Sequence, residues 1–173
     1  MQPSSTRQRG FTLLIAALVA SIVLSFASAI FDIAQKQVAL ASLSQQSQYA
    51  FYAADTGAEC ALYWDVRFAY FMQTTPVLTP PPICDGTPLV FTPPSGGQPY
   101  AYPYTFSFQF APNGYCAQIT VQKCQGTISG GGVCTTQAGG SISTQIRAYG
   151  YNTSCATTGT SPVALQRSVE LNY

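Results

Sequence analysis

The amino-acid sequence predicts an α+β fold: a long N-terminal helix packed on a four-stranded antiparallel sheet and stapled by disulfides. Three observations support this fold class. No proline occurs between residues 11 and 71, whereas nine prolines fall between residues 73 and 103. From residue 104 onward, apolar and polar side chains alternate with the two-residue period of a strand. All six cysteines follow the apolar N-terminal stretch, and an even number in an exported chain indicates disulfides.

The first element is an apolar stretch at residues 11–31, which contains no charged residue, proline or glycine. Its length is about what a helix needs to cross the hydrocarbon core of a bilayer. Arg7 and Arg9 precede it, and Asp32 and Lys36 are the first charges after it. Because basic residues favour the cytoplasmic side, we expect the N-terminal tail in the cytoplasm and the rest of the chain exported.

The junction between Gly10 and Phe11 is more specific than the apolar stretch alone. A short polar and basic leader, residues 1–10, ends in Gly10 and is followed directly by Phe11, Thr12 and Leu13. This junction resembles the cleavage site of type IV prepilins and pseudopilins. The resemblance implies that prepilin peptidase cuts after Gly10 and that Phe11 is N-methylated. It also implies that the apolar stretch stays in the mature chain, first as a membrane anchor and later in the core of a filament.

Two further features refine the resemblance. Most proteins of this family carry glutamate at the fifth residue of the mature chain, and here that position is Ile15. PilX-like minor pilins and K-type pseudopilins commonly lack this glutamate, and they carry a stretch similar to Ala54, Gly57 and Glu59 at the same depth. Placing a carboxylate in hydrocarbon costs much free energy unless a partner neutralises it. A subunit with no neighbour above it therefore has no use for a glutamate at this position. The resemblance therefore implies a priming or tip subunit.

Two other interpretations of the N-terminus stay open. A basic region, an apolar run and a small-x-small site also describe a secretory signal, and Ala27, Ser28 and Ala29 would form that site. A plain single-span anchor is the third interpretation. The first residue of the mature chain separates the first two, because prepilin processing gives Phe11 and signal cleavage gives Ile30.

The helix is expected to run from residue 11 to about Asp65 or Phe68. We divide it into a membrane or filament-core half at residues 11–32 and a head-domain half at residues 33–70. Small side chains recur every four residues along one face of its first half: Ala17, Ser21, Ser25 and Ala29. In membranes such a stripe lets helices pack closely, although a span rich in alanine and serine also produces it by chance.

Residues 71–103 are expected to form an irregular connection, because their many prolines prevent a helix or a central strand. The sheet is expected in residues 104–173, with strands in four segments: 104–110, 115–124, 142–150 and 163–171. Pro112, Asn113 and Gly114 predict a turn between the first two strands. Short to medium connections favour an antiparallel meander, and the helix around residues 53–64 can cover its apolar face.

Six cysteines allow fifteen pairings, and the sequence does not choose among them. Cys116 and Cys124 lie on the same face of one predicted strand, roughly 26 Å apart, which is too far for a bond between them. Each therefore needs a partner in a loop. The set that we prefer joins Cys60 with Cys84, Cys116 with Cys155, and Cys124 with Cys134. A zinc site is the rival interpretation, but the sequence has no Cys-x-x-Cys spacing and no histidine.

The composition argues against several function classes. Only 8% of the residues are charged, and the formal net charge of +1 becomes −1 if cleavage removes Arg7 and Arg9, so there is no specific signal for nucleic-acid binding. Without histidine, Ser-His-Asp and Cys-His arrangements are impossible. Asp55 and Glu59 lie on one helix face and have three interpretations: half of a metal site, a solvent-exposed face, or a contact with a neighbouring subunit. We expect no enzyme activity, no metal and no cofactor.

The first functional hypothesis is a minor type IV pilin or pseudopilin. It would be held in the inner membrane as a single-pass protein with an exported C-terminal domain, and then join a cell-surface pilus or a periplasmic pseudopilus. Its partners would be other pilins through the N-terminal helix, prepilin peptidase and the inner membrane. The second hypothesis is a surface adhesin or binding module that uses the exposed sheet and the loops at residues 126–140 and 152–162. The third is a single-span anchored, exported β-domain protein unrelated to filaments.

Overall fold

The computed structural model describes residues 8–75 and 81–173 of the chain. The first seven residues of the predicted leader lie outside these ranges. The chain forms two compact units, one that ends at Ser44 and one from Gln45 to Tyr173. The second unit contains the strands described below and the last part of the long helix. It therefore begins later in the chain than the head-domain half predicted from residue 33.

The first element, α1, is an α-helix from Gln8 to Phe68. It matches the helix predicted from residue 11 to about Asp65 or Phe68. Its residues 11–31 are apolar with exposed side chains, and the helix is long and apolar enough to cross a membrane. The hydroxyls of Ser21 and Ser25 donate to backbone carbonyl oxygens about one turn earlier at 2.8 Å, so both are satisfied within the helix itself.

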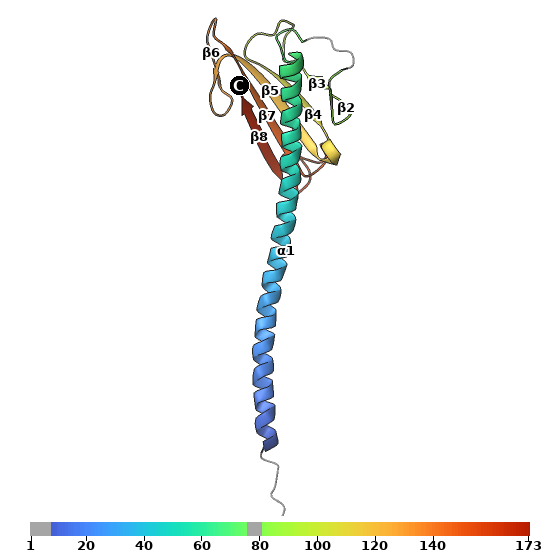
Figure 1. Ribbon diagram of the computed structural model, residues 1–173, viewed down its shortest axis with the longest axis vertical. Helices are drawn as coiled ribbons and strands as arrows, with labels where there is room; N and C mark the ends of the chain where they lie inside the picture. Colours follow the sequence, from blue (N-terminus) through green and yellow to red (C-terminus); the bar gives the residue numbers. More distant parts are fainter. Residues whose placement is uncertain (1–7, 76–80) are drawn as a thin grey trace, which may run out of the picture. The chain divides into compact units, whose positions relative to one another are not determined.

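The main sheet is antiparallel and has the strand order β3-β4-β5-β7-β8, with β6 paired to the last residues of β5 (Figure 1). Its strands are β3 (Phe91–Thr92), β4 (Tyr104–Phe110), β5 (Cys116–Ile128), β6 (Cys134–Thr136), β7 (Ile142–Tyr151) and β8 (Gln166–Asn172). The four predicted strands are β4, β5, β7 and β8, so the α+β class and the antiparallel sheet are confirmed. The predicted number of four strands is too small, because β3 and β6 also join the sheet.

The connection at residues 71–103 contains more regular structure than its proline content predicts. β1 (Ile83–Cys84) and β2 (Thr87–Pro88) pair as a small antiparallel sheet, and β3 pairs with β4. Each of these strands has only two residues and lies at an edge, where a proline without an N–H interrupts no central ladder. The turn predicted after β4 is a short 3-10 helix, η1 (Pro112–Gly114).

The part of α1 after Gln45 lies across one face of the sheet (Figure 1). Small side chains of the helix are buried there: Ala50, Ala53, Ala54, Ala58 and Ala61. Gly57 and Gly150 allow an even closer approach. A Cβ on Gly57 would come within 3.0 Å of Ile119, and a Cβ on Gly150 would overlap the backbone of α1 at Ala50 and Ala54. Gly57 weakens the isolated helix by about 1 kcal/mol, and the close packing of α1 on the sheet explains why a glycine is needed there.

The rest of the core is largely aromatic. Alternate residues of β4 are at most 5% exposed: Tyr104, Phe106, Phe108 and Phe110. Phe71, which is fully buried, packs on Phe106 and Phe108 with ring centroids 5.4 and 6.1 Å apart. The disulfide between Cys60 and Cys84 joins α1 to β1, with 6.1 Å between the two Cα atoms. It ties the proline-rich connection to the helix that covers the core.

Candidate functional site

The sheet face that points away from α1, here called the outer face, is polar. Because side chains alternate along a strand, the residues between the buried aromatics of β4 lie on this face. Ser107 and Gln109 of β4 lie beside Thr120 and Gln118 of β5, respectively, and Gln118 lies beside Tyr149 of β7. These five side chains are partly buried or exposed, and none of them carries a charge at neutral pH. We call them the floor residues.

A groove of about 620 Å³ is lined by the five floor residues, and we call it the outer groove. Its other lining includes Pro88 at the end of β2, Val90 between β2 and β3, and Thr92 of β3. Val90 is 84% exposed, so its side chain is available as a wall of the groove and is not part of the core. The groove therefore combines a polar floor with a partly apolar wall.

Two disulfides lie toward opposite ends of the outer-face row of β5. Cys116 is bonded to Cys155 and Cys124 to Cys134, with Cα separations of 4.6 and 5.8 Å. Together with the bond between Cys60 and Cys84, these are the three pairs preferred from the sequence. Both cysteines of β5 are fully buried although they lie on the outer face. The loops that carry their partners thus flank the floor residues on both sides.

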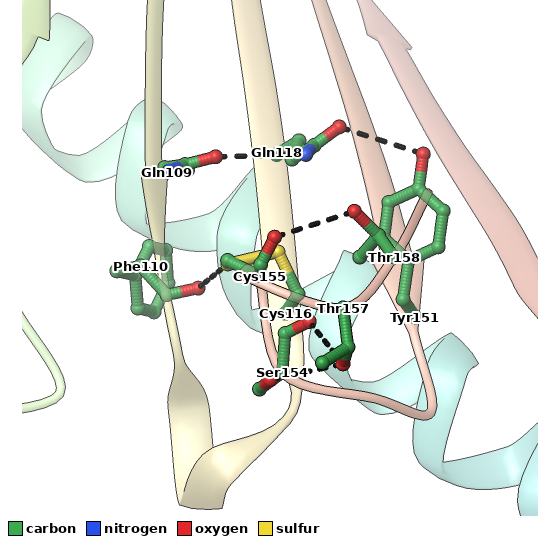
Figure 2. The surroundings of a disulfide bond; sticks show 9 residues. All are labelled: Gln109, Phe110, Cys116, Gln118, Tyr151, Ser154, Cys155, Thr157 and Thr158. Atoms are coloured by element: carbon green, nitrogen blue, oxygen red, sulfur yellow. Dashed lines mark hydrogen bonds between the residues drawn. A yellow bond between two sulfur atoms is a disulfide. The ribbon is translucent and has the colours of Figure 1, made fainter. Parts of the chain in front are cut away.

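Figure 2 shows the surroundings of the first of these disulfides. Gln109, Gln118 and Tyr151 form a row across β4, β5 and β7, beside the bond between Cys116 and Cys155. The amide nitrogen of Gln118 donates to the amide oxygen of Gln109 at 3.5 Å, and the Tyr151 hydroxyl donates to the amide oxygen of Gln118 at 3.4 Å. These bonds are long and therefore weak, so the amides of the row keep hydrogen-bonding capacity for a ligand.

The loop between β5 and β6 lies against the outer face near the second disulfide. A Cβ on Gly132 would come within 2.8 Å of the amide oxygen of Gln145 and 3.4 Å of that of Gln122. Gly132 also has a φ of +86°, a conformation that L side chains rarely adopt. Close contact with the outer face therefore explains why this loop needs glycine.

The charged side chains Arg147 and Glu170 on the outer face pair with each other. Arg147 Nη2 lies 3.0 Å from Glu170 Oε2, and the amide nitrogen of Gln145 donates to the same carboxylate at 2.9 Å. The hydrogen bond to Glu170 raises the pKa of Arg147. Hydrogen bonds from Asn172 and then Arg147 lower the pKa of Glu170. The pair is neutral overall, so it adds no net charge to the face.

Within residues 8–75 and 81–173, no group of three or more His, Cys, Asp or Glu side chains lies close enough to hold a metal ion. Asp55 and Glu59 thus have no third ligand in this part of the chain. Lys123 donates to the hydroxyl of Thr144 at 2.8 Å, but both residues are buried and Lys123 is also paired with Asp65. The side chains that can bind a ligand in the outer groove are therefore the neutral amides and hydroxyls of the floor residues.

The structure places the other predicted residues along α1. Gly10 and Phe11 lie near the start of the helix, and the side chain of Phe11 is 67% exposed. The four residues of the predicted packing stripe are exposed: Ala17, Ser21, Ser25 and Ala29. Their contact with another helix stays a prediction. The outer groove cannot be recognised from the sequence, although polar residues at every second position of β4 and β5 mark its floor, because its wall depends on the two-residue strand β3.

Comparison with protein-family models, with curated proteins and with solved structures found no match. Function is therefore inferred from the residues and the geometry of the chain itself.

Proposed function

We propose that this chain is a minor subunit of a type IV pilus or pseudopilus, without enzyme activity, anchored in the inner membrane by residues 11–31 before assembly. The observation that carries the proposal is α1, which runs from Gln8 to Phe68. Its first part is apolar and exposed, and its last part packs on the sheet. Pilins and pseudopilins use such a helix in two halves, one in the membrane or filament core and one as the support of a head domain.

The first part of α1 needs an apolar environment. The side chains of Leu13, Leu14, Val23 and Leu24 are between 59% and 72% exposed. A continuous apolar surface of this kind marks contact with a membrane or with another protein. In the proposed cycle, a bilayer supplies this contact before assembly and the helices of neighbouring subunits supply it in the filament.

The leader and the disulfides fit the same cycle. Arg7 and Arg9 favour the cytoplasmic side, so the chain after residue 31 would be exported to an oxidising compartment. Prepilin peptidase would cut after Gly10 and leave Phe11 as the first residue, ready for methylation. The three disulfides of the second unit are the bonds expected of an exported domain.

Ile15 supports a priming or tip position over a place in the shaft. A carboxylate at this depth would require a partner to offset the cost of its burial in hydrocarbon. An isoleucine requires none, so the subunit needs no neighbour at that point. The stripe that begins with Ala17 and Ser21 would contact the helix of an adjacent subunit.

The first residue of the native protein tests this proposal. Mass spectrometry of the protein isolated from membranes should find a chain that begins at N-methylated Phe11. Gly10→Leu should block cleavage, and loss of prepilin peptidase should leave the leader in place, whereas the control Gln8→Ala should be cut normally. A chain that begins at Ile30, or an uncut chain in cells that contain the peptidase, would overturn the proposal.

The outer groove favours a second function, a binding surface carried by the exported domain. A tip subunit would expose such a surface. This function corresponds to the adhesin hypothesis, and it does not require the filament assignment to be correct. A single-span anchored protein outside any filament would present the same groove.

A further inference from the structure

We propose that the outer groove binds a neutral oligosaccharide. The inference goes beyond the filament assignment and does not depend on it. It stands on four properties of the groove: the hydrogen-bonding character of its floor, its lack of unpaired charge, the position of its strands inside the sheet, and the disulfide-bonded loops beside it.

The floor residues suit a ligand rich in hydroxyl groups. Amides and hydroxyls each supply donors as well as acceptors, as sugar hydroxyls do. Ser107, Gln109 and Gln118 present such groups on two adjacent strands, which lie about 4.8 Å apart. The hydroxyl of Thr120 donates to the backbone carbonyl of Arg147 at 3.3 Å and offers a ligand an acceptor. Tyr149 adds an aromatic ring and a further hydroxyl on the third strand. The floor is thus a lattice of neutral groups that can bond several neighbouring hydroxyls at once.

The absence of free charge on the floor distinguishes this ligand class from phosphates, carboxylates and nucleic acids. A phosphate site needs lysine or arginine whose charge is available to the ligand. Of the charged side chains next to the floor, Arg147 is engaged by Glu170 through two bonds, Nε and Nη2 at 3.2 and 3.0 Å from the same oxygen. We therefore expect the groove to bind a neutral ligand with higher affinity than an anion.

The position of the floor within the sheet argues against a peptide strand. Peptides that extend a sheet bind to the unpaired backbone of an edge strand. β5 and β7 each lie between two paired strands, and β3 occupies the outer edge of β4 at Ser107 and Phe108, so a peptide that extends the sheet beside Ser107 would have to displace β3. A ligand in the groove must be recognised by side chains, and the apolar surface of Val90 and Pro88 can contact the C–H face of a sugar ring.

The loops beside the groove are fixed before any ligand arrives. Cys155 and Cys134 hold them to the outer face at the two ends of the floor. Because these two loops are already tethered, less conformational entropy is lost if a bound oligosaccharide extends from the groove onto them.

A glycan array tests the proposal. The full chain, kept soluble by a detergent without a sugar headgroup, is applied to neutral hexose and N-acetylhexosamine oligosaccharides, with sialylated and sulfated glycans and single-stranded DNA as charged comparators. We expect saturable binding to at least one neutral oligosaccharide, followed by calorimetric titration with that compound. Binding only to the charged ligands, or to none of the printed compounds, would refute the proposal.

Three variants place the binding site. Gln118→Ala should weaken binding about tenfold, the effect of losing one or two hydrogen bonds. Val90→Trp changes an 84% exposed wall residue and should block the groove without touching the core. The matched control Gln137→Ala removes an exposed amide from the loop after β6 and should leave the affinity unchanged. Neutral glycan binding that survives Val90→Trp, or that Gln137→Ala weakens equally, would put the site elsewhere and contradict the proposal.

Discussion

Lys123 of β5 and Asp65 of α1 form a buried ion pair, with Nζ 2.5 Å from Oδ2 and side chains that are 10% and 5% exposed. Asp65 also accepts a hydrogen bond from the Tyr173 hydroxyl at 2.5 Å, and Lys123 also donates to Thr144 at 2.8 Å. The pair therefore connects the end of α1 to β5, to β7 and to the residue that follows β8.

Removing one partner of this pair should be costly. Asp65→Ala leaves Lys123 buried without its carboxylate, and we expect the free energy of unfolding to fall by about 3–5 kcal/mol. The double variant Asp65→Leu with Lys123→Met should recover most of that loss, because apolar side chains can replace a buried pair at little net cost. Urea unfolding followed by the fluorescence of Trp64, the single tryptophan, measures both. Equal losses in the two variants would show that the ion pair is not the cause.

Gly150 should not tolerate alanine. The added Cβ would overlap backbone atoms of α1 at Ala50 and Ala54, so the helix must shift away from the sheet. We expect Gly150→Ala to lower the free energy of unfolding by about 1–3 kcal/mol, the range for overpacking a core. Gly159→Ala is the matched control, since no atom lies within 4 Å of its added Cβ. The same urea titration compares them, and a neutral Gly150→Ala would contradict the close contact.

The two disulfides of β5 should differ in their effect on stability. Cys116 and Cys155 are 39 residues apart in sequence, whereas Cys124 and Cys134 are 10 apart. In the chain-entropy description, a longer closed loop gives more stabilisation, about 4 kcal/mol for the first bond and about 3 kcal/mol for the second. Replacing both cysteines of each pair by serine and measuring urea unfolding tests the order. A larger loss for the pair with the shorter loop would rule out loop entropy as the main cause.

Alkaline pH should destabilise the second unit. Tyr104 is 5% exposed and donates a hydrogen bond to Phe71 O at 3.1 Å. Burial, and then the neighbouring Tyr102, raise the pKa of Tyr104 above its ordinary value of 10. The unfolded chain therefore loses this proton first, so the stabilisation is complete below pH 10 and decreases as the pH rises above it, by up to about 1.4 kcal/mol per pH unit.

Tyr104→Phe removes this titrating group and tests its contribution. We expect the variant to be about 1 kcal/mol less stable at pH 8, where it lacks the hydrogen bond, and to show a shallower decline between pH 10 and pH 11. Tyr63→Phe, at a side chain that is 55% exposed, is the control. Urea titrations at pH 8, 10 and 11 compare the three proteins. Parallel declines in the wild type and Tyr104→Phe would assign the pH effect to other groups.

Strong local patterns made much of the fold predictable. The proline-free segment gave the extent of α1, because proline is the residue that most reliably ends a helix. Side chains alternate between the two faces of β4, so the apolar set that contains Tyr104 and Phe106 had to lie on one face and the polar set on the other. The apolar set is the one that faces the core. The distance between Cys116 and Cys124 along one strand excluded their pairing, and the two nearby loops offered the partners that the structure shows.

Features that depend on tertiary contacts were not predictable. β3 has only two residues, too few to show a two-residue period, and its pairing of Phe91 with Phe108 and of Thr92 with Ser107 makes it a strand. The groove needs that strand as a wall, so the sequence suggested the exposed sheet as a binding surface without locating a groove on it. Lys123 and Asp65 are 58 positions apart in the chain, and nothing local to either residue reveals that they meet.

Both cysteines that fasten the loops of the outer face belong to β5, which lies in the middle of the sheet and keeps its register with β4 and β7. Each doubling of a tethered loop's length costs only about 0.6 kcal/mol in closure entropy. Insertions and substitutions between the tether points should therefore be tolerated while the scaffold beneath stays the same.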